Sequence, residues 1–385
     1  MLLLISSPRQ SAPLIDFVND QKKGGLFVIG HVRIGQLEGN GDPLAAEYKY
    51  WLWLVDHLKV KAFTELCLSE SVRSGAAQLS RLSGLGAMKP DTVLLGFRDD
   101  AAPIDFFTQP SSLYKSCKFD LESGESIFPL RKSSDRRMSP TEYVQILSDV
   151  LCVKKNLCIC RHFHKLNMAD VDRKSPSLKY IDVWLVDLLK PCREEPFTVR
   201  SLFTLQLAAV VKSARGWQHF KLRLFYIDIP PPSPLYIHED GNIRSVGSSP
   251  VDPNIPTLAS GRPAHERLVE LLKLLRISAS VHRVSDWPRL DNERWTGDYS
   301  PQEDVTQYNK IPLDYIECVN HIIQARSSTE TAVNFIQLPA PPQGNFVDES
   351  FNPSEQYLKV LDGFTKDLTP TILVRGLKSV TSTSL

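Results

Sequence analysis

The chain has 385 residues, which is too long for one small domain and suits two domains of ordinary size. Its 45 Lys and Arg nearly balance 44 Asp and Glu, so no net charge favours binding to nucleic acid or anionic lipid. Seven scattered cysteines and the absence of an Asn-x-Ser/Thr sequon favour a reducing compartment. The longest apolar run, Ser201 to Val210, is about half the length that a spanning helix needs. We therefore expect that this chain does not itself cross a membrane.

Ten short runs rich in leucine or β-branched residues alternate with helical patterns. Several are continuously apolar, which is typical of parallel strands covered on both faces. The runs are 2–6, 26–32, 64–68, 92–97, 157–163, 179–186, 221–229, 279–284, 332–338 and 371–375. This alternation predicts an α/β fold with right-handed crossovers. Five runs followed by five predict two similar lobes, 1–165 and 166–385, each a mostly parallel five-stranded sheet flanked by helices.

The intervening segments carry helix signals. Apolar residues repeat at helical spacing in three segments, at 143/146/147/150, at 268/271/272/275 and at 357/361/364/368. Ser139-Pro140-Thr141-Glu142 and Asn352-Pro353-Ser354-Glu355 are typical of helix N-termini with a capping side chain. Gly84 is expected to end a helix before the strand at 92–97.

Two long segments interrupt this rhythm. The loop 101–138 is polar and serine-rich, and the loop 230–262 is rich in proline. Loops of this length are usually regulatory, disordered or both.

The carboxyl ends of the first two strands are the best candidate for a ligand site. In open α/β sheets, ligands bind where the strand order reverses. The polar or glycine residues there are Ser6, Ser7, Arg9, Gly30 and His31, and ATP or ADP is the candidate ligand. No complete glycine-rich phosphate-binding motif is present, so ordinary turn chemistry is the alternative.

Other polar groups predict no catalysis. Cys158, Cys160, His162 and His164 alternate along a strand, so the outer pair would lie about 20 Å apart, too far to share one zinc ion. The paired carboxylates Asp99-Asp100 and Glu194-Glu195 are interpreted as solvated loop charges. No nucleophile elbow or Ser-His-Asp set occurs, and an enzyme is not indicated.

Regulatory features are more numerous. Ser139 follows Arg136-Arg137-Met138, a basic spacing that many kinases recognise, and Ser133 and Ser134 follow Arg131-Lys132. These three serines are the phosphorylation candidates, and Ser139 has the second reading of a helix cap. Thr383 and Leu385 fit a C-terminal ligand of a strand-addition domain such as PDZ.

The helix at 45–58 is unusually aromatic. We expect Tyr48, Trp51, Leu52 and Val55 to pack on the sheet as one stripe. The remaining apolar residues, Tyr50, Trp53 and Leu54, suggest either a second partner or deep burial.

Four segments together resemble the cytosolic C-terminal domain of cation–chloride cotransporters, solute carrier family 12. Gly84-Leu85-Gly86-Ala87-Met88-Lys89-Pro90-Asp91-Thr92 resembles that family's G-L-G-x-M-K-x-N-T run, with Asp91 in place of Asn. The other three are 24–32, 331–342 and 368–376, in the family's order. The C-terminus, without the family's usual Tyr-Ser ending, resembles the outlying member-nine branch of cotransporter-interacting proteins.

The resemblance implies two universal-stress-protein-like lobes that dimerise beneath a multi-pass transporter and regulate it. The implied partners are the protein's own transmembrane transport domain, a second copy or sibling cotransporters, and protein kinases, with no nucleic acid and no required cofactor. The implied location is the cytoplasmic face of a membrane. Two alternatives stay open, a free-standing nucleotide-binding protein of the universal stress type and a scaffold that recruits PDZ partners.

Overall fold

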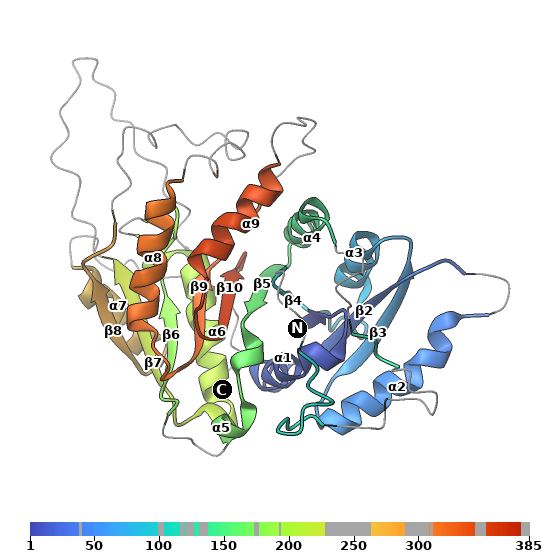
Figure 1. The fold of residues 1–385 in the computed structure, drawn as a ribbon. Helices are drawn as coiled ribbons and strands as arrows, with labels where there is room; N and C mark the ends of the chain where they lie inside the picture. The colour runs from blue at the N-terminus through green and yellow to red at the C-terminus, as the bar shows by residue number, and fades with distance from the viewer. Residues whose placement is uncertain are drawn as a thin grey trace.

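The computed structural model describes residues 1–37, 41–98, 104–115, 119, 127–130, 138–172, 177–191, 194–227, 263–288, 308, 311–342 and 352–378. It contains a ten-stranded sheet with helices on both faces (Figure 1). The strands are β1 Leu2–Leu4, β2 Val28–Ile34, β3 Phe63–Ser69, β4 Thr92–Gly96, β5 Asn156–Arg161, β6 Tyr180–Trp184, β7 Lys221–Ile227, β8 Ala279–Val284, β9 Thr331–Gln337 and β10 Thr371–Arg375. All ten strands coincide with the runs expected from the sequence.

The α-helices occupy most of the segments between the strands. They are α1 Pro8–Gln21, α2 Pro43–Leu58, α3 Val72–Leu82, α4 Pro140–Cys152, α5 Met168–Asp172, α6 Val199–Ser213, α7 Ala264–Leu274, α8 Leu313–Arg326 and α9 Pro353–Phe364. Short 3₁₀ helices lie at Phe163–Lys165, Glu195–Phe197 and Arg215–Trp217. No helix among the described residues is long and apolar enough to span a membrane.

The strand order shows how the two sets of five strands are related. The order is β3-β2-β1-β4-β5-β10-β9-β6-β7-β8, and all neighbours are parallel except β5 and β10. Each set therefore repeats one topology, and the antiparallel pair joins them about a pseudo-two-fold axis. The predicted α/β class is confirmed, but the two five-stranded sheets form one continuous sheet. The lobe boundary at 165 stays a prediction.

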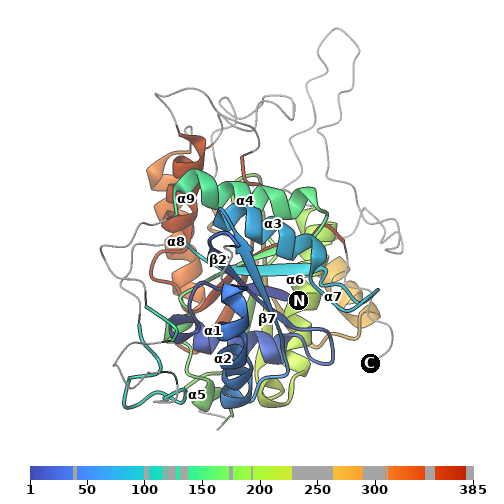
Figure 2. The same ribbon diagram turned by 90° about the vertical axis from the view of Figure 1, so that its right-hand side faces the viewer.

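Each face of the sheet is covered by helices from both sets. One core joins side chains of α1, α2, α6 and α7, and a second core joins those of α3, α4, α8 and α9. This division follows from right-handed crossovers, because successive connections that run in opposite directions along a sheet lie on opposite faces. Figure 2 shows α3, α4 and α9 together on one side and α1 and α2 on the other.

The helix ends carry the caps that the sequence predicts. The Ser139 Oγ accepts from the Glu142 backbone N at 3.1 Å, and the Asn352 Oδ1 accepts from the Ser354 N at the same distance. Gly84 follows α3 with φ +126°, and a Cβ there would lie 2.4 Å from the Met88 carbonyl oxygen. This contact explains why only glycine suits the turn between α3 and β4.

The stripe expected on α2 is wrong in part. Trp51, Leu54 and Leu58 are the buried residues of this helix, whereas Tyr48 and Leu52 are 44% and 45% exposed. Helical spacing alone could not choose between these overlapping apolar stripes, because both have nearly the same period.

Candidate functional site

The strand order places two equivalent ligand loci in the sheet. It reverses direction between β1 and β4, and again between β6 and β9. At such points the following loops leave toward opposite faces and open a crevice beyond the carboxyl ends of the strands. The predicted site residues lie at the first locus.

Arg9 at the first locus is already paired within the chain. It is the second residue of α1, only 4% exposed, and its Nη2 lies 2.8 Å from Asp105 Oδ2. Burial raises the pKa of the Asp105 carboxyl, but hydrogen bonds from Arg9 and the Phe107 backbone outweigh burial and hold that pKa below its usual value. The guanidinium that was expected to meet a phosphate therefore meets an internal carboxylate.

The other predicted residues do not converge on one point. A Cβ on Gly30 would lie 2.9 Å from Leu4 Cδ2, so this position faces packed side chains. His31 Nδ1 lies 3.0 Å from the Ile5 carbonyl oxygen, and burial lowers the pKa of the His31 imidazole. Ser6 is exposed next to the end of β1.

Ser7, by contrast, is buried. It is the residue before α1, and its Oγ has no hydrogen-bond partner among the described residues. It is the one predicted polar group here that is both buried and unpaired in that part of the chain.

An aromatic segment from the loop 101–138 packs beside this locus. We use "aromatic segment" for residues 104–115, 119 and 127–128, whose side chains Phe106, Phe107, Tyr114, Phe119 and Phe128 are all buried. The Tyr114 hydroxyl donates to Asp16 of α1 at 3.0 Å, and its carbonyl oxygen lies 3.2 Å from His57 Nε2 of α2. The loop expected to be polar thus supplies part of the core between α1 and α2.

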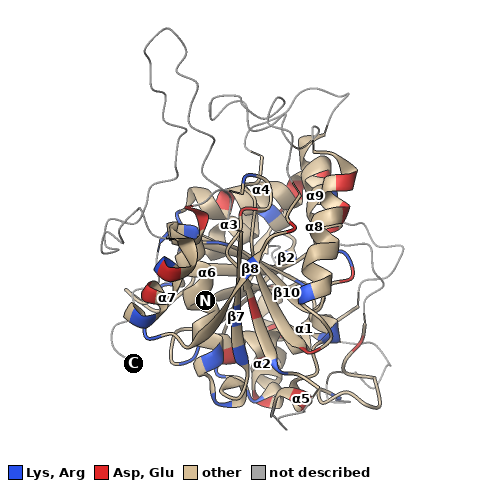
Figure 3. Ribbon diagram, turned by 90° about the vertical axis from the view of Figure 1, so that its left-hand side faces the viewer, with Lys and Arg blue, Asp and Glu red and all other residues tan. Residues whose placement is uncertain are grey.

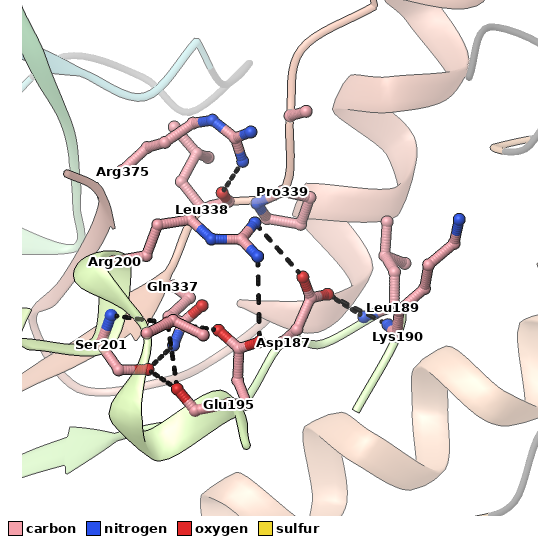
Figure 4. A network of polar contacts seen from close by, with 12 residues as sticks. Asp187, Leu189, Lys190, Glu195, Arg200, Ser201, Gln337, Leu338, Pro339 and Arg375 are labelled. Atoms are coloured by element: carbon pink, nitrogen blue, oxygen red, sulfur yellow. Dashed lines mark hydrogen bonds and ion pairs between the residues drawn. The ribbon is translucent and has the colours of Figure 1, made fainter. Parts of the chain in front are cut away.

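The second locus contains a polar network that the sequence analysis missed (Figure 4). Arg200 lies 3.6 Å from Asp187 and 3.8 Å from Glu195. Arg375, at the end of β10, donates to the Leu338 carbonyl oxygen at 3.2 Å. Burial, followed by the nearby Arg200, lowers the pKa of the Arg375 guanidinium.

Glu195 corrects the interpretation of Glu194-Glu195 as solvated charge. It is 3% exposed in the short 3₁₀ helix that precedes α6, and burial, followed by the nearby Asp187, raises the pKa of its carboxyl. Thr198 Oγ1 donates to Glu195 Oε1 at 3.2 Å. Glu194 is paired with Arg267 at 2.8 Å. The sequence concealed both contacts because their partners lie on other elements or one turn along the chain.

A positional signal relates the two loci. Arg9 is the second residue of α1 and Arg200 is the second residue of α6, the first helices of the two sets. In each set, this arginine pairs with a buried or partly buried carboxylate. An alignment of the two halves on their first helices would have indicated Arg200.

The remaining candidates are accounted for individually. Cys158 and Cys160 are buried in β5, and the His162 Nε2 lies 2.9 Å from the Thr365 carbonyl oxygen. No group of three metal-ligating side chains occurs in the described ranges. Ser139 is exposed and caps α4. Ser133, Ser134, Thr383, Leu385, the pair Asp99-Asp100 and all of 230–262 lie outside the described residues.

Comparisons with known proteins give the family. The profile of Solute carrier family 12 matches residues 11–105. Solute carrier family 12 member 9 of Xenopus laevis is 39% identical over 396 aligned positions, which cover 100% of this chain and 40% of the relative. The chain belongs to solute carrier family 12. The likeness to member 9 extends over its whole length, as the sequence analysis expected.

Two solved structures are similar at low identity. The cytoplasmic domain of a prokaryotic cation chloride cotransporter is 11% identical with a TM-score of 0.44, covering 97% of this chain and 94% of that one. A universal stress protein from Archaeoglobus fulgidus DSM 4304 is 13% identical with the same TM-score of 0.44, covering 97% of this chain and 96% of that one. The chain spans about two-fifths of the length of its member 9 relative, at 40%.

Proposed function

We propose that this chain is the cytosolic regulatory domain of a membrane cation–chloride symporter, or of a protein that modulates one. The observation that carries the proposal is the 39% identity over the entire chain to part of a member 9 protein. The 60% of that relative outside the match leaves room for a transport domain. In this proposal, the domain controls transport by contact, and shifts the populations of transporter conformations.

The test uses the full-length protein and this domain supplied separately. Cells that express the full-length protein should show a chloride-dependent rubidium flux. The flux is carried either by this protein or by a co-expressed sibling cotransporter. Deletion of residues 1–385 should change the flux. When the domain is expressed from a second plasmid, the flux should be restored. The domain should also co-purify with the membrane part. Unchanged flux after deletion, together with no co-purification, would contradict the proposal.

Dimerisation and phosphorylation are finer parts of this proposal. The Ser139 Oγ already accepts a backbone N–H at the start of α4, so a phosphate there would lie at the positive end of the helix dipole. Ser139→Asp should therefore keep α4 stable, whereas Ser139→Ala should lower the free energy of unfolding by about 1 kcal/mol. A regulatory role requires, in addition, that Ser139→Asp and Ser139→Ala change the flux in opposite directions.

Nucleotide binding at Ser6, Ser7, Arg9, Gly30 and His31 stays a prediction. The pairing of Arg9 with Asp105 means that a nucleotide phosphate would have to displace an internal ion pair. A rise in melting temperature with ATP or ADP would support binding, because a ligand that binds the native state stabilises it. The PDZ ligand at Thr383 and Leu385 stays a prediction too, tested by deleting the last three residues.

A further inference from the structure

The sheet has an open edge at β3. In the described part of the chain, β3 pairs with β2 on one side and with no strand on the other. Phe63 N donates to Phe27 O at 2.9 Å, and Gly35 N donates to Ser69 O at 3.0 Å. Because alternate residues of a parallel strand bond to one neighbour, residues 63, 65, 67 and 69 face β2. The backbone N–H and C=O groups that point outward belong to Thr64, Leu66 and Leu68.

A groove of about 690 Å³ runs along this edge. One wall is α2, the floor is β3, and the other wall is the turn at Gly84-Leu85. Large apolar side chains line the groove and remain open to solvent, with Phe63 52% and Leu85 53% exposed. Figure 2 looks onto this side of the molecule.

Exposed apolar residues concentrate in the part of the sequence that builds this edge. Nine of the thirteen large hydrophobic side chains that are exposed within the described ranges lie between residues 34 and 88. They are Ile34, Leu37, Tyr48, Leu52, Trp53, Phe63, Leu82, Leu85 and Met88. Four of them, Tyr48, Leu52, Phe63 and Leu85, line the groove, and exposed apolar patches mark interaction sites.

A buried hydroxyl also lines the groove without a partner. Thr64 is 8% exposed, and its Oγ1 has no hydrogen-bond partner among the described residues. Since buried polar groups are nearly always paired, this hydroxyl is a second sign that the groove is incomplete.

The opposite edge lacks these features. At β8, His282 and Arg283 are exposed, and Figure 3 shows further charged residues on α7 and the neighbouring strands. Charged side chains are the usual protection of a sheet edge against pairing. β3 contains no lysine, arginine or proline, and its single charge is Glu65.

We propose that the β3 edge binds an extended segment of another polypeptide, which adds to the sheet as an eleventh strand. An extended segment that adds to the edge would pair with the outward backbone groups of β3 in register, as in other proteins that bind peptides by strand addition. Side chains of the bound segment would alternate between the two walls of the groove, and apolar residues suit both walls. The charged residues of the groove are Asp42 and Glu65, both acidic, so the bound segment carries a lysine or arginine near Glu65.

Charge argues against a second copy as the occupant. Pairing β3 with β3 of another copy would bring two Glu65 carboxylates and no cation to the shared groove. Like charges across strands destabilise a sheet. This inference does not depend on the proposed role in transport.

The test is a selection from a displayed library of random decapeptides against the whole chain. The enriched peptides should alternate apolar residues and carry at least one lysine or arginine. Binding of a synthesised winner, measured by fluorescence anisotropy, should weaken roughly tenfold in Glu65→Lys, and the same peptide with glutamate in place of its cations should then bind the variant better.

Glu70→Lys is the matched control, because Glu70 is exposed beyond the end of β3 and outside the groove. It should leave the affinity unchanged. Hydrogen exchange should show new protection on peptide binding at the amides of Thr64, Leu66 and Leu68, and none at residues 63, 65, 67 and 69, which are already bonded. The proposal is overturned if the selection yields no peptides with alternating apolar residues and a lysine or arginine. It is also overturned if Glu65→Lys and Glu70→Lys change the affinity equally, or if the chain dimerises through this edge.

Discussion

At the scale of single residues, the Asp182 carboxylate is a buried charge on an interior strand of the sheet. It is fully buried in β6 and accepts from Arg223 Nε and Nη2, both at 2.7 Å. Thr331 Oγ1 donates a third hydrogen bond at 2.8 Å. Both carboxylate oxygens therefore accept hydrogen bonds and one of the donors is a cation, which is what a buried charge requires.

Removing the Asp182 carboxylate should show how much its pairing with Arg223 contributes to the free energy of unfolding. Asp182→Ala should lower the free energy of unfolding by about 3–5 kcal/mol, because Arg223 is left partly buried without its counter-charge. The measurement is urea denaturation. Lys359→Ala, which breaks the exposed pair with Glu355 on α9, should cost about 0.5 kcal/mol or less. Similar losses for both variants would show that Asp182 contributes no more than a surface charge.

His162 gives a prediction about pH. Burial lowers the pKa of its imidazole to about 4, below the usual 6.5. Between about pH 6.5 and pH 4, the unfolded chain therefore binds a proton that the folded chain does not, so stability falls as the pH is lowered through this window. His162 contributes about 2–3 kcal/mol to that fall.

His162→Asn tests the assignment, since asparagine tolerates the left-handed backbone at this position, where φ is 61°. The difference in unfolding free energy between pH 7 and pH 4 should become smaller in the variant. An unchanged difference would mean that another group carries the pH dependence.

At the scale of elements, the aromatic segment is the clearest departure from expectation. Phe119 is 1% exposed and lies 5.4 Å from Phe107 and 5.2 Å from Phe128, measured between ring centroids. Serine and charge dominate the composition of 101–138, but scattered aromatics suffice to bury part of it. The composition of a segment averages over all its residues, whereas burial depends on the few large aromatic side chains that it contains.

Phe119→Ala should therefore lower the free energy of unfolding by about 3–5 kcal/mol, the usual loss for a buried phenylalanine. Leu113→Ala in the same segment should have almost no effect, because Leu113 is 54% exposed. Thermal and urea denaturation of both variants make the comparison. A small effect of Phe119→Ala would place the aromatic segment outside the cooperative core.

At the scale of the whole molecule, the β5–β10 pair joins the two sets of strands. Five residues of each strand pair, from Thr371 with Arg161 to Arg375 with Leu157. Arg161 continues the junction, with its Nη1 donating to the Asp362 carbonyl oxygen at 3.1 Å. We expect the two lobes to be stable only together, since each alone would expose a long central strand.

Co-expression of 1–165 and 166–385 as separate chains tests this expectation. The two pieces should co-purify as one complex with a single unfolding transition. Leu373→Pro should abolish the complex. The Val374 carbonyl oxygen accepts from Leu338 N of β9, so the alternate residue Leu373, which pairs with Ile159, directs its backbone N–H toward β5, and proline would remove that donor from the junction. Independent, monomeric pieces would contradict the expectation.

The strand positions, the α/β class and the helix caps were determined by the sequence itself. Strands covered on both faces must be continuously apolar, and a cap must place its oxygen within one turn of the helix start, so both leave local signals. Ser7 and Arg9 could be named as candidate site residues for a similar reason, because they follow a predicted strand closely in the sequence.

Only the tertiary structure decided the single sheet, the network around Glu195 and the open edge at β3. Backbone hydrogen bonding is the same for every residue, so nothing in β5 or β10 specifies its partner across the junction. The pairing of Arg9 with Asp105 spans 96 residues, and that of Asp182 with Thr331 spans 149. Contacts at such separations depend on how the chain returns to itself, which local residue patterns do not encode.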